Sequence, residues 1–159
     1  MTTVRVVTGR GTAPTAMAAY DTALAAADAH DYNLVTVSSV VPADAALTVV
    51  DALPDLGSAG DRLTVVQSRA SREPGADATG VAGLGWALSA DGPGLLYEAS
   101  GADAETVRAA IRDGLDHAVG LRDWAVADSD VVLETVEPDA TGHACAVVLA
   151  ALGRGEPVA

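Results

Sequence analysis

The sequence predicts an α+β fold: a four-layer αββα sandwich in which two sheets face each other and one helix covers each outer face. Three observations predict it. The chain has 159 residues, which suits one domain with a single core. Its segments follow the order β-α-β, several β, α, β-β, and two long helices are too few to cover a parallel sheet strand by strand. Its apolar residues are mostly Ala and Val with no Phe, which favours sheets and closely packed helices.

The first part of the chain is predicted to form a strand, a turn and a helix. Residues 4–7 are a short β-rich run, and the glycines of Gly9-Arg10-Gly11 predict a turn after it. Pro14 suits the first turn of a helix over residues 14–29. The apolar face of that helix is predicted from the spacing of Met17, Tyr20 and Leu24. A turn is favoured over a phosphate-binding loop, because the third glycine of a dinucleotide fingerprint and the Lys of a P-loop are missing.

The middle of the chain is predicted to be rich in strands. Residues 33–41 predict one buried strand, and residues 42–60 predict a long surface connection with a short extended piece near residues 47–50. The Pro and Gly of residues 91–94 predict a hairpin. Further strands are predicted over residues 63–69, 81–89, 94–100, 130–137 and 143–152.

A second helix is predicted after the hairpin. Asp103 is its expected N-cap, Glu105 lies in the first turn, where negative charge is favourable, and the helix should end near Gly120. Its apolar face is predicted from Val107, Ile111, Leu115 and Ala118. Because no linker or internal repeat interrupts the pattern, residues 1–159 are predicted to form a single domain.

Charge and composition exclude several classes of partner. The net charge is −13, from 22 acidic residues against nine basic ones, all of them Arg. Such a chain is not expected to bind nucleic acid phosphates. The composition resembles that of salt-in halophiles; an ordinary acidic protein from a high-GC organism is the alternative. No apolar stretch or leader pattern indicates a membrane or secreted protein, and the single Cys145 cannot form an internal disulfide, so a cytoplasmic protein is expected.

The ordinary classes of catalytic site find little support. No Gly-x-Ser-x-Gly elbow marks a Ser-His-Asp nucleophile, and the three His and one Cys lack the close spacing of metal ligands, so no metal is expected. Cys145 is predicted to be a small core residue. Two adjacent serines, Ser38 and Ser39, end a β-rich run and indicate a place where the chain could cut itself. We call this pair the serine doublet.

The serine doublet belongs to a longer pattern. Its most specific pieces are Asn33-Leu34-x-x-x-Ser38-Ser39-x-x-Pro42 and Tyr97-Glu98. Together with Gly9-x-Gly11 and Tyr20-Asp21, this pattern resembles the pyruvoyl-dependent arginine decarboxylase family, and the resemblance covers nearly the whole chain. It implies the sandwich of the pyruvoyl-dependent histidine and arginine decarboxylases.

The resemblance implies that the chain cleaves itself into a β chain of residues 1–38 and an α chain of residues 39–159. The Ser39 hydroxyl would attack the Ser38 carbonyl and form an ester, and β-elimination followed by hydrolysis would leave a pyruvoyl group at position 39. This cofactor would form an imine with L-arginine and accept the electrons released when CO2 leaves, which yields agmatine. Pyridoxal phosphate is not expected, because the chain has no Lys to hold it.

Three further site residues follow from the match to the family pattern. The resemblance implies that Glu98 donates a proton to the substrate carbon, that Asn33 orients the pyruvoyl group or polarises its carbonyl, and that Asp21 binds the substrate guanidinium. The alternatives are that Glu98 is a solvated carboxylate at a strand end, that Asn33 caps a turn and that Asp21 is one surface charge among many.

The resemblance also implies partners and a role. Family members form a homotrimer or a dimer of trimers with sites where subunits meet, and agmatine would serve polyamine biosynthesis or modification of transfer RNA. Two alternatives stay open: a paralogue that does not process and acts as a binding or partner subunit, or a pyruvoyl enzyme for a different amino acid.

Overall fold

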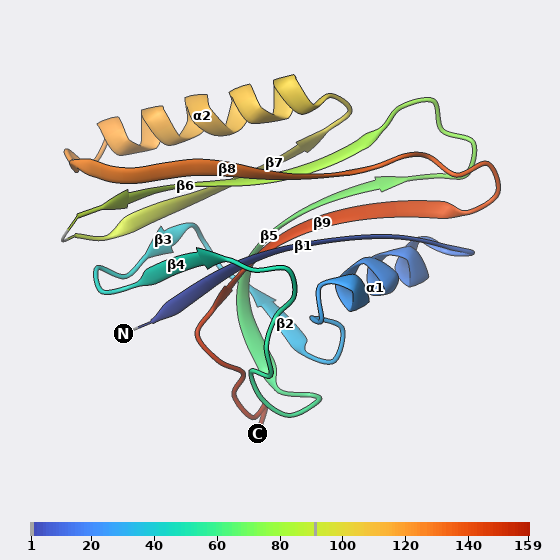
Figure 1. Ribbon diagram of the computed structural model, residues 1–159, viewed down its shortest axis with the longest axis horizontal. Coiled ribbons are helices and arrows are strands. Elements are labelled where there is room, and N and C mark those ends of the chain that lie inside the picture. Colours follow the sequence, from blue (N-terminus) through green and yellow to red (C-terminus); the bar gives the residue numbers. More distant parts are fainter. Residues whose placement is uncertain (1, 91) are drawn as a thin grey trace.

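The computed structural model describes residues 2–90 and 92–159, which contain two helices and nine strands. Figure 1 shows their arrangement. In chain order the elements are β1 (Thr3–Ala13), α1 (Ala16–Ala26), β2 (Asn33–Thr36), β3 (Val40–Val41), β4 (Ala46–Val49), β5 (Arg62–Arg72), β6 (Gly80–Ser89), β7 (Gly94–Gly101), α2 (Ala104–Gly120), β8 (Val126–Val136) and β9 (His143–Leu152).

The strands form two sheets. The five-stranded sheet has the order β2-β5-β9-β1-β4, and the four-stranded sheet has the order β3-β7-β6-β8. The β1·β4 and β2·β5 pairs are parallel, and the other pairs are antiparallel. The predicted hairpin joins β6 to β7, although Asp91 in its connector lies outside the described residues. Segregated helices and mostly antiparallel sheets confirm the predicted α+β class.

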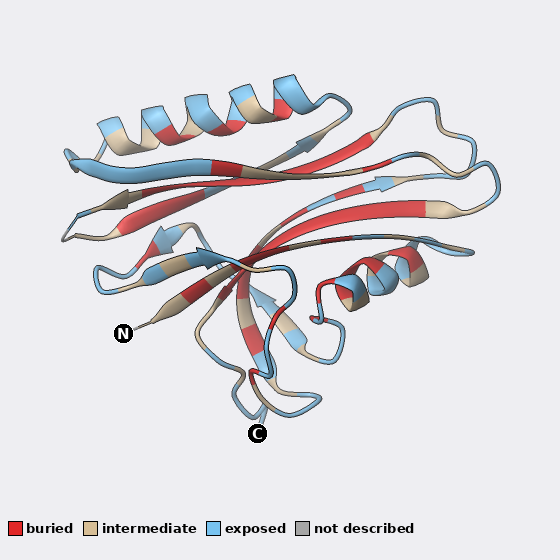
Figure 2. Cartoon of the chain, viewed as in Figure 1, coloured by how far each residue is buried: buried red, intermediate tan, exposed pale blue. Residues whose placement is uncertain are grey.

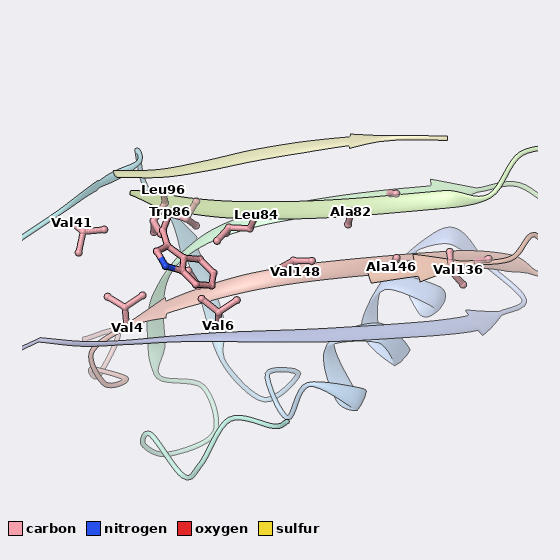
Figure 3. Packing of buried hydrophobic residues seen from close by; sticks show 14 residues of the cluster. Val4, Val6, Val41, Ala82, Leu84, Trp86, Leu96, Val136, Ala146 and Val148 are labelled. Atoms are coloured by element: carbon pink, nitrogen blue, oxygen red, sulfur yellow. The ribbon is translucent and has the colours of Figure 1, made fainter. Parts of the chain in front are cut away.

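Three apolar cores hold the elements together. Between the two sheets, Trp86 and Leu96 face Val6 and Val148 (Figure 3). On the outer side of the five-stranded sheet, α1 packs its buried residues Ala19, Ala23 and Leu24. On the outer side of the four-stranded sheet, α2 packs Val107, Ile111 and Leu115. Each helix is therefore buried on one face and exposed on the other (Figure 2).

The turn predicted at Gly9-Arg10-Gly11 is wrong, because β1 runs straight through it to Ala13. The glycines serve packing. A Cβ on Gly9 would collide with the carbonyl oxygen of Ala23, and one on Gly11 would lie 2.5 Å from Cγ2 of Thr22. These two positions therefore let α1 approach the strand closely.

The single buried strand predicted over residues 33–41 is also wrong. The segment divides into β2 and β3, which lie at the edges of different sheets. Because an edge strand has a neighbour on one side only, its side chains remain accessible. Val35, Val37 and Val40 are 42%, 39% and 50% exposed.

Both predicted helices exist, with one correction to α1. This helix begins after Thr15, whose side chain accepts a hydrogen bond from the Ala18 N–H, and Met17 is 73% exposed rather than part of the apolar face. Asp103 caps α2 as predicted, and that helix ends at Gly120. Within the described residues, neither helix is long and apolar enough to cross a lipid bilayer.

Candidate active site at the serine doublet

The serine doublet lies where the chain passes from one sheet to the other. Just before it, the Val37 N–H donates to the Val65 carbonyl oxygen at 3.0 Å, which ties the chain to β5 of the five-stranded sheet. Just after it, the Ser39 carbonyl oxygen accepts from the Leu96 N–H at 2.7 Å, which ties the chain to β7 of the four-stranded sheet. The Ser38–Ser39 peptide bond is therefore the covalent link between the two sheets at this edge.

The hydroxyls of the doublet are free to react. Ser38 is exposed and Ser39 is partly exposed. Neither hydroxyl is hydrogen-bonded to another described residue. Because Oγ of Ser39 is three bonds from its own backbone nitrogen, its attack on the Ser38 carbonyl closes a five-membered ring. The sequence itself therefore supplies the proximity that such an attack requires.

Glu98 lies close to the doublet along β7. Val40 pairs with Leu95, so the next antiparallel pair places Ser39 opposite Leu96. Glu98 follows two residues later, about 7 Å along the strand, and points to the same face of β7 as Leu96. Its side chain is exposed where β7 continues beyond the short strand β3, and its backbone pairs with Leu84 of β6. The structure thus brings Ser39 and Glu98 to one edge of the four-stranded sheet.

A residue that sequence reasoning missed secures this edge. Ser68 of β5 is the one buried polar residue among those described, at 4% exposure. Its hydroxyl donates to the Ala99 carbonyl oxygen at 2.7 Å and accepts from the Gly83 N–H at 3.2 Å. It therefore joins the two sheets beside Glu98. A serine in a strand carries no sequence signal of this role, since the bridge depends on how the sheets stack.

Asn33 does not meet Ser39 within one chain. It begins β2, whereas the doublet follows the end of that strand, and its Nδ2 donates to the Gly60 carbonyl oxygen at 2.7 Å. Asn33 and Val37 are four residues apart in an extended segment, or about 13 Å. Asn33 and Ser39 therefore lie at opposite ends of β2.

Asp21 is exposed on α1 and lines an open hollow of about 460 Å³. Tyr20, Leu24, His30 and Tyr32 also line it. The hollow lies on the outer side of the five-stranded sheet and reaches the residue before Asn33. Asp21 lines this hollow, whereas Asn33, Ser39 and Glu98 do not, so the hollow alone does not bring the predicted site residues together.

A chain of side chains connects α1 to the end of β2. The Tyr20 hydroxyl donates to Oε1 of Gln67 at 2.7 Å, and Nε2 of Gln67 donates to the Thr36 hydroxyl at 3.1 Å. Arg69 stacks over the Tyr20 ring at 4.3 Å. The helix that carries Asp21 is thereby fixed to the strand that leads into the doublet.

Other reactive groups give no competing site in the described part of the chain. Cys145 is buried, as predicted, and burial raises the pKa of its thiol, which disfavours the thiolate. No group of three or more His, Cys, Asp or Glu residues that could hold a metal occurs among residues 2–90 and 92–159.

Comparison with known proteins decides the family. The family model described as pyruvoyl-dependent arginine decarboxylase matches residues 3–157. The chain belongs to the pyruvoyl-dependent arginine decarboxylase family. Two relatives named pyruvoyl-dependent arginine decarboxylase, from strains R1 and NRC-1 of Halobacterium salinarum, are each 48% identical over 161 aligned positions, which cover 99% of this chain and 98% of the relative. The predicted resemblance is confirmed over the full length.

The doublet has the chemistry that a pyruvoyl-dependent arginine decarboxylase needs. Making the cofactor from the chain requires a serine whose hydroxyl can attack the preceding carbonyl, and Ser39 has an unbonded hydroxyl in an accessible link between two anchored segments. A family enzyme with this cofactor needs no Lys for a Schiff base, and the chain contains none. The residues present therefore fit the pyruvoyl group.

Proposed function

We propose that this protein cleaves itself between Ser38 and Ser39 and then decarboxylates L-arginine to agmatine and CO2 with a pyruvoyl group derived from Ser39. The observation that carries the proposal is the doublet itself: an accessible bond with a free Ser39 hydroxyl, held between two sheets and beside Glu98. Family membership supports both the cofactor and the substrate class. The expected location is the cytoplasm, where free arginine is available.

The fold assigned to this activity is the four-layer αββα sandwich of the pyruvoyl-dependent histidine and arginine decarboxylases. Its support is the packing of α1 and α2 on the outer sides of the two facing sheets. Cleavage would divide the single domain into a β chain of residues 1–38 and an α chain of residues 39–159. The break falls between the sheets, so each sheet keeps its own hydrogen bonds.

The chain's residues divide the work of decarboxylation. The pyruvoyl group supplies a ketone that holds the substrate amine and takes up the electrons of the breaking carbon–carbon bond. Glu98 holds the proton that replaces CO2 on the substrate carbon, and the Leu96 N–H fixes the carbonyl of residue 39. The bulky apolar side chain of Leu96, buried in the core between the sheets, keeps water from this side of the site.

Asp21 selects the substrate in this proposal. Its carboxylate can accept two parallel hydrogen bonds from a planar guanidinium. The hollow that it lines has apolar walls from Leu24 and Tyr20, which suit the methylene chain of arginine. Asn33 orients the reacting group in this proposal.

A trimer would complete the site. Asn33 and the doublet lie at opposite ends of β2 in one chain, and Asp21 lies on the outer side of the five-stranded sheet. A contact between subunits can place Asp21 and Asn33 of one copy beside Ser39 and Glu98 of the next. The exposed Val35, Val37 and Val40 flank the doublet and support such a contact, because apolar side chains gathered at an edge favour burial in an interface. A homotrimer or dimer of trimers is therefore proposed.

Intact-mass measurement tests the proposal directly. The purified protein is expected to show one chain that ends at Ser38 and a second chain blocked by a pyruvoyl group at position 39. Ser39→Ala removes the nucleophile and should leave one full-length chain. Ser38→Ala keeps both the attacking hydroxyl and a carbonyl at position 38 and serves as the matched control that still cleaves.

An activity assay in high salt separates the remaining alternatives. Agmatine and CO2 from arginine support the proposal. An intact wild-type chain without activity would indicate a paralogue that acts as a binding or partner subunit. Cleavage without arginine turnover, combined with turnover of another amino acid, would overturn the substrate assignment.

A further inference from the structure

The hydrogen bond from the Leu96 N–H to the Ser39 carbonyl oxygen joins the doublet to β7, and it also contacts a residue that reacts. At 2.7 Å it is shorter than the usual 2.9–3.0 Å of an N–H···O bond, and it ends on the carbonyl of the residue that must react. The donor is held firmly, because the Leu96 side chain is 1% exposed and packs in the core between the sheets. The donor therefore cannot easily turn away from Ser39.

Self-cleavage develops negative charge on two different oxygens. In the first stage, attack by the Ser39 hydroxyl places charge on the Ser38 carbonyl oxygen. In the second stage, loss of the α-proton of Ser39 places charge on the Ser39 carbonyl oxygen, because the electron pair is delocalised as an enolate. Among the described residues, a backbone donor reaches the second oxygen and none reaches the first.

We propose that the Leu96 N–H is the oxyanion donor of the elimination stage of self-cleavage. The inference rests on the proposed function, since it requires that Ser39 be processed. A fixed donor aimed at an oxygen where charge develops stabilises the transition state more than the ground state. The bond thus lowers the barrier for removing the Ser39 α-proton.

The two stages and the hydrolysis that follows need no reactant other than water. In the first stage the Ser38 carbon forms a bond to Oγ of Ser39 and loses its bond to nitrogen, and the hydroxyl proton moves to that nitrogen. In the second stage the α-proton of Ser39 passes to water, its electron pair forms the Cα=Cβ double bond, and the Cβ–Oγ bond breaks to release Ser38 as a carboxylate. Water then replaces the nitrogen at position 39, and ammonia leaves.

Replacing the Leu96 amide by an ester tests the donor alone. Incorporation of the α-hydroxy acid that corresponds to Leu96 keeps the side chain and deletes the N–H. We expect formation of the Ser38–Ser39 ester at the normal rate and elimination slowed about 100-fold, the effect typical of losing one oxyanion donor. The uneliminated ester should accumulate.

Hydroxylamine reports that ester without any activity assay. It cleaves the accumulated ester to give a chain that ends at Ser38 as a hydroxamate and a chain that begins at Ser39 with a free amine. Mass spectrometry distinguishes this product from the pyruvoyl-blocked chain and from cleavage at the introduced ester at position 96. A time course gives the rate constant of each stage.

Two backbone esters serve as controls. The Val50 N–H donates to the Val6 carbonyl oxygen at 2.9 Å just after the edge strand β4, away from the doublet, so its ester should process normally. The Val37 N–H anchors the doublet on its other side at 3.0 Å. Its ester loosens the segment without touching the Ser39 carbonyl and should not accumulate the Ser38–Ser39 ester.

The outcomes separate this inference from the proposed function. If the wild-type chain never cleaves after Ser38, the proposed function is overturned. A wild-type chain that cleaves, beside a folded Leu96 ester that eliminates at the normal rate, would overturn the donor role alone. Equal accumulation of the ester in the Val37 control would also overturn it, because the effect would then come from loosening. Thermal melting at high salt establishes that each variant is folded.

Discussion

Ser68 shows how one buried hydroxyl can set the spacing of two sheets. Its oxygen satisfies the Gly83 N–H and the Ala99 carbonyl at the same time. Ser68→Ala leaves both groups buried without that partner, so we expect a loss of about 1–3 kcal/mol in the free energy of unfolding. Denaturant unfolding in high salt measures it.

A neighbouring serine provides the control for that experiment. Ser71 lies on the same strand but is exposed, and Ser71→Ala should change stability by less than about 0.5 kcal/mol. Equal stability of the Ser68 and Ser71 variants would show that the bridge between the sheets contributes nothing.

Asp103 links the stability of α2 to pH. The backbone N–H of Thr106, followed by its side-chain hydroxyl, holds the pKa of this carboxyl below its usual value of 3.8. A folded pKa below the unfolded one means that the charged group stabilises the fold above about pH 4 and that this contribution disappears as pH falls through the folded value. The negative charge of Asp103 is also favourable because it lies at the N-terminus of α2, where the helix dipole stabilises negative charge.

Asp103→Asn removes the titration but keeps a side-chain oxygen for the cap. We expect wild type to have the higher melting temperature at pH 6 and the difference to shrink steadily below pH 4. Melting curves of both proteins across this range, at constant salt, measure the difference. A gap that stays constant down to pH 2 would contradict the assignment.

At the scale of elements, the approach of α1 to β1 depends on glycine. A methyl group at position 9 meets the backbone of Ala23, which cannot move without shifting the helix. We therefore expect Gly9→Ala to lower the free energy of unfolding by about 2–3 kcal/mol, as overpacking does in other cores. Gly120 at the end of α2 has nothing within 4 Å of an added Cβ, so Gly120→Ala is the matched control. Denaturant unfolding that shows equal effects at both positions would contradict the packing role.

The sequence predicted elements better where local patterns decide the structure. Asp103 and the repeat of Val107, Ile111 and Leu115 located α2 closely, because capping and helical spacing are local. Gly9-Arg10-Gly11 was misleading: a glycine needed for close packing looks like one needed for a turn. The break between β2 and β3 was missed because β-branched residues predict a strand without showing which sheet it joins.

The candidate site divides in the same way. The doublet and Glu98 were identified by a pattern of residues, and the pairing of β3 with β7 brings them together. Ser68 was missed because its role depends on contact between sheets that are distant in sequence. Neither pattern nor single-chain geometry unites Asp21 with Ser39, and only the proposed trimer would bring them together.

At the scale of the whole molecule, the charge of −13 makes stability depend on salt. Like charges dispersed over the surface repel one another, and salt shortens their range from about 10 Å at 0.1 M to about 3 Å at 1 M. We expect the melting temperature to rise as sodium chloride increases from 0.1 M to 2 M. A double variant of exposed α2 residues, Asp113→Asn with Asp116→Asn, should show a weaker rise. Equal melting temperatures at all salt concentrations would contradict adaptation of this protein to high salt.

The position of the proposed cleavage site decides whether the two proposed chains would stay together. Residues 1–38 contain β1, which lies between β9 and β4 and pairs with β9 from Val4 to Ala13. They also contain α1 and the fully buried residues Val4, Val6 and Val7. Cleavage between the sheets removes none of these contacts. We therefore expect both chains to co-elute in size-exclusion chromatography at the volume of uncleaved Ser39→Ala and to separate only in denaturant. Exchange of isotopically labelled residues 1–38 into unlabelled protein under native conditions would show that β1 is not held in this way, because withdrawing a central strand requires breaking its ladders on both sides at once.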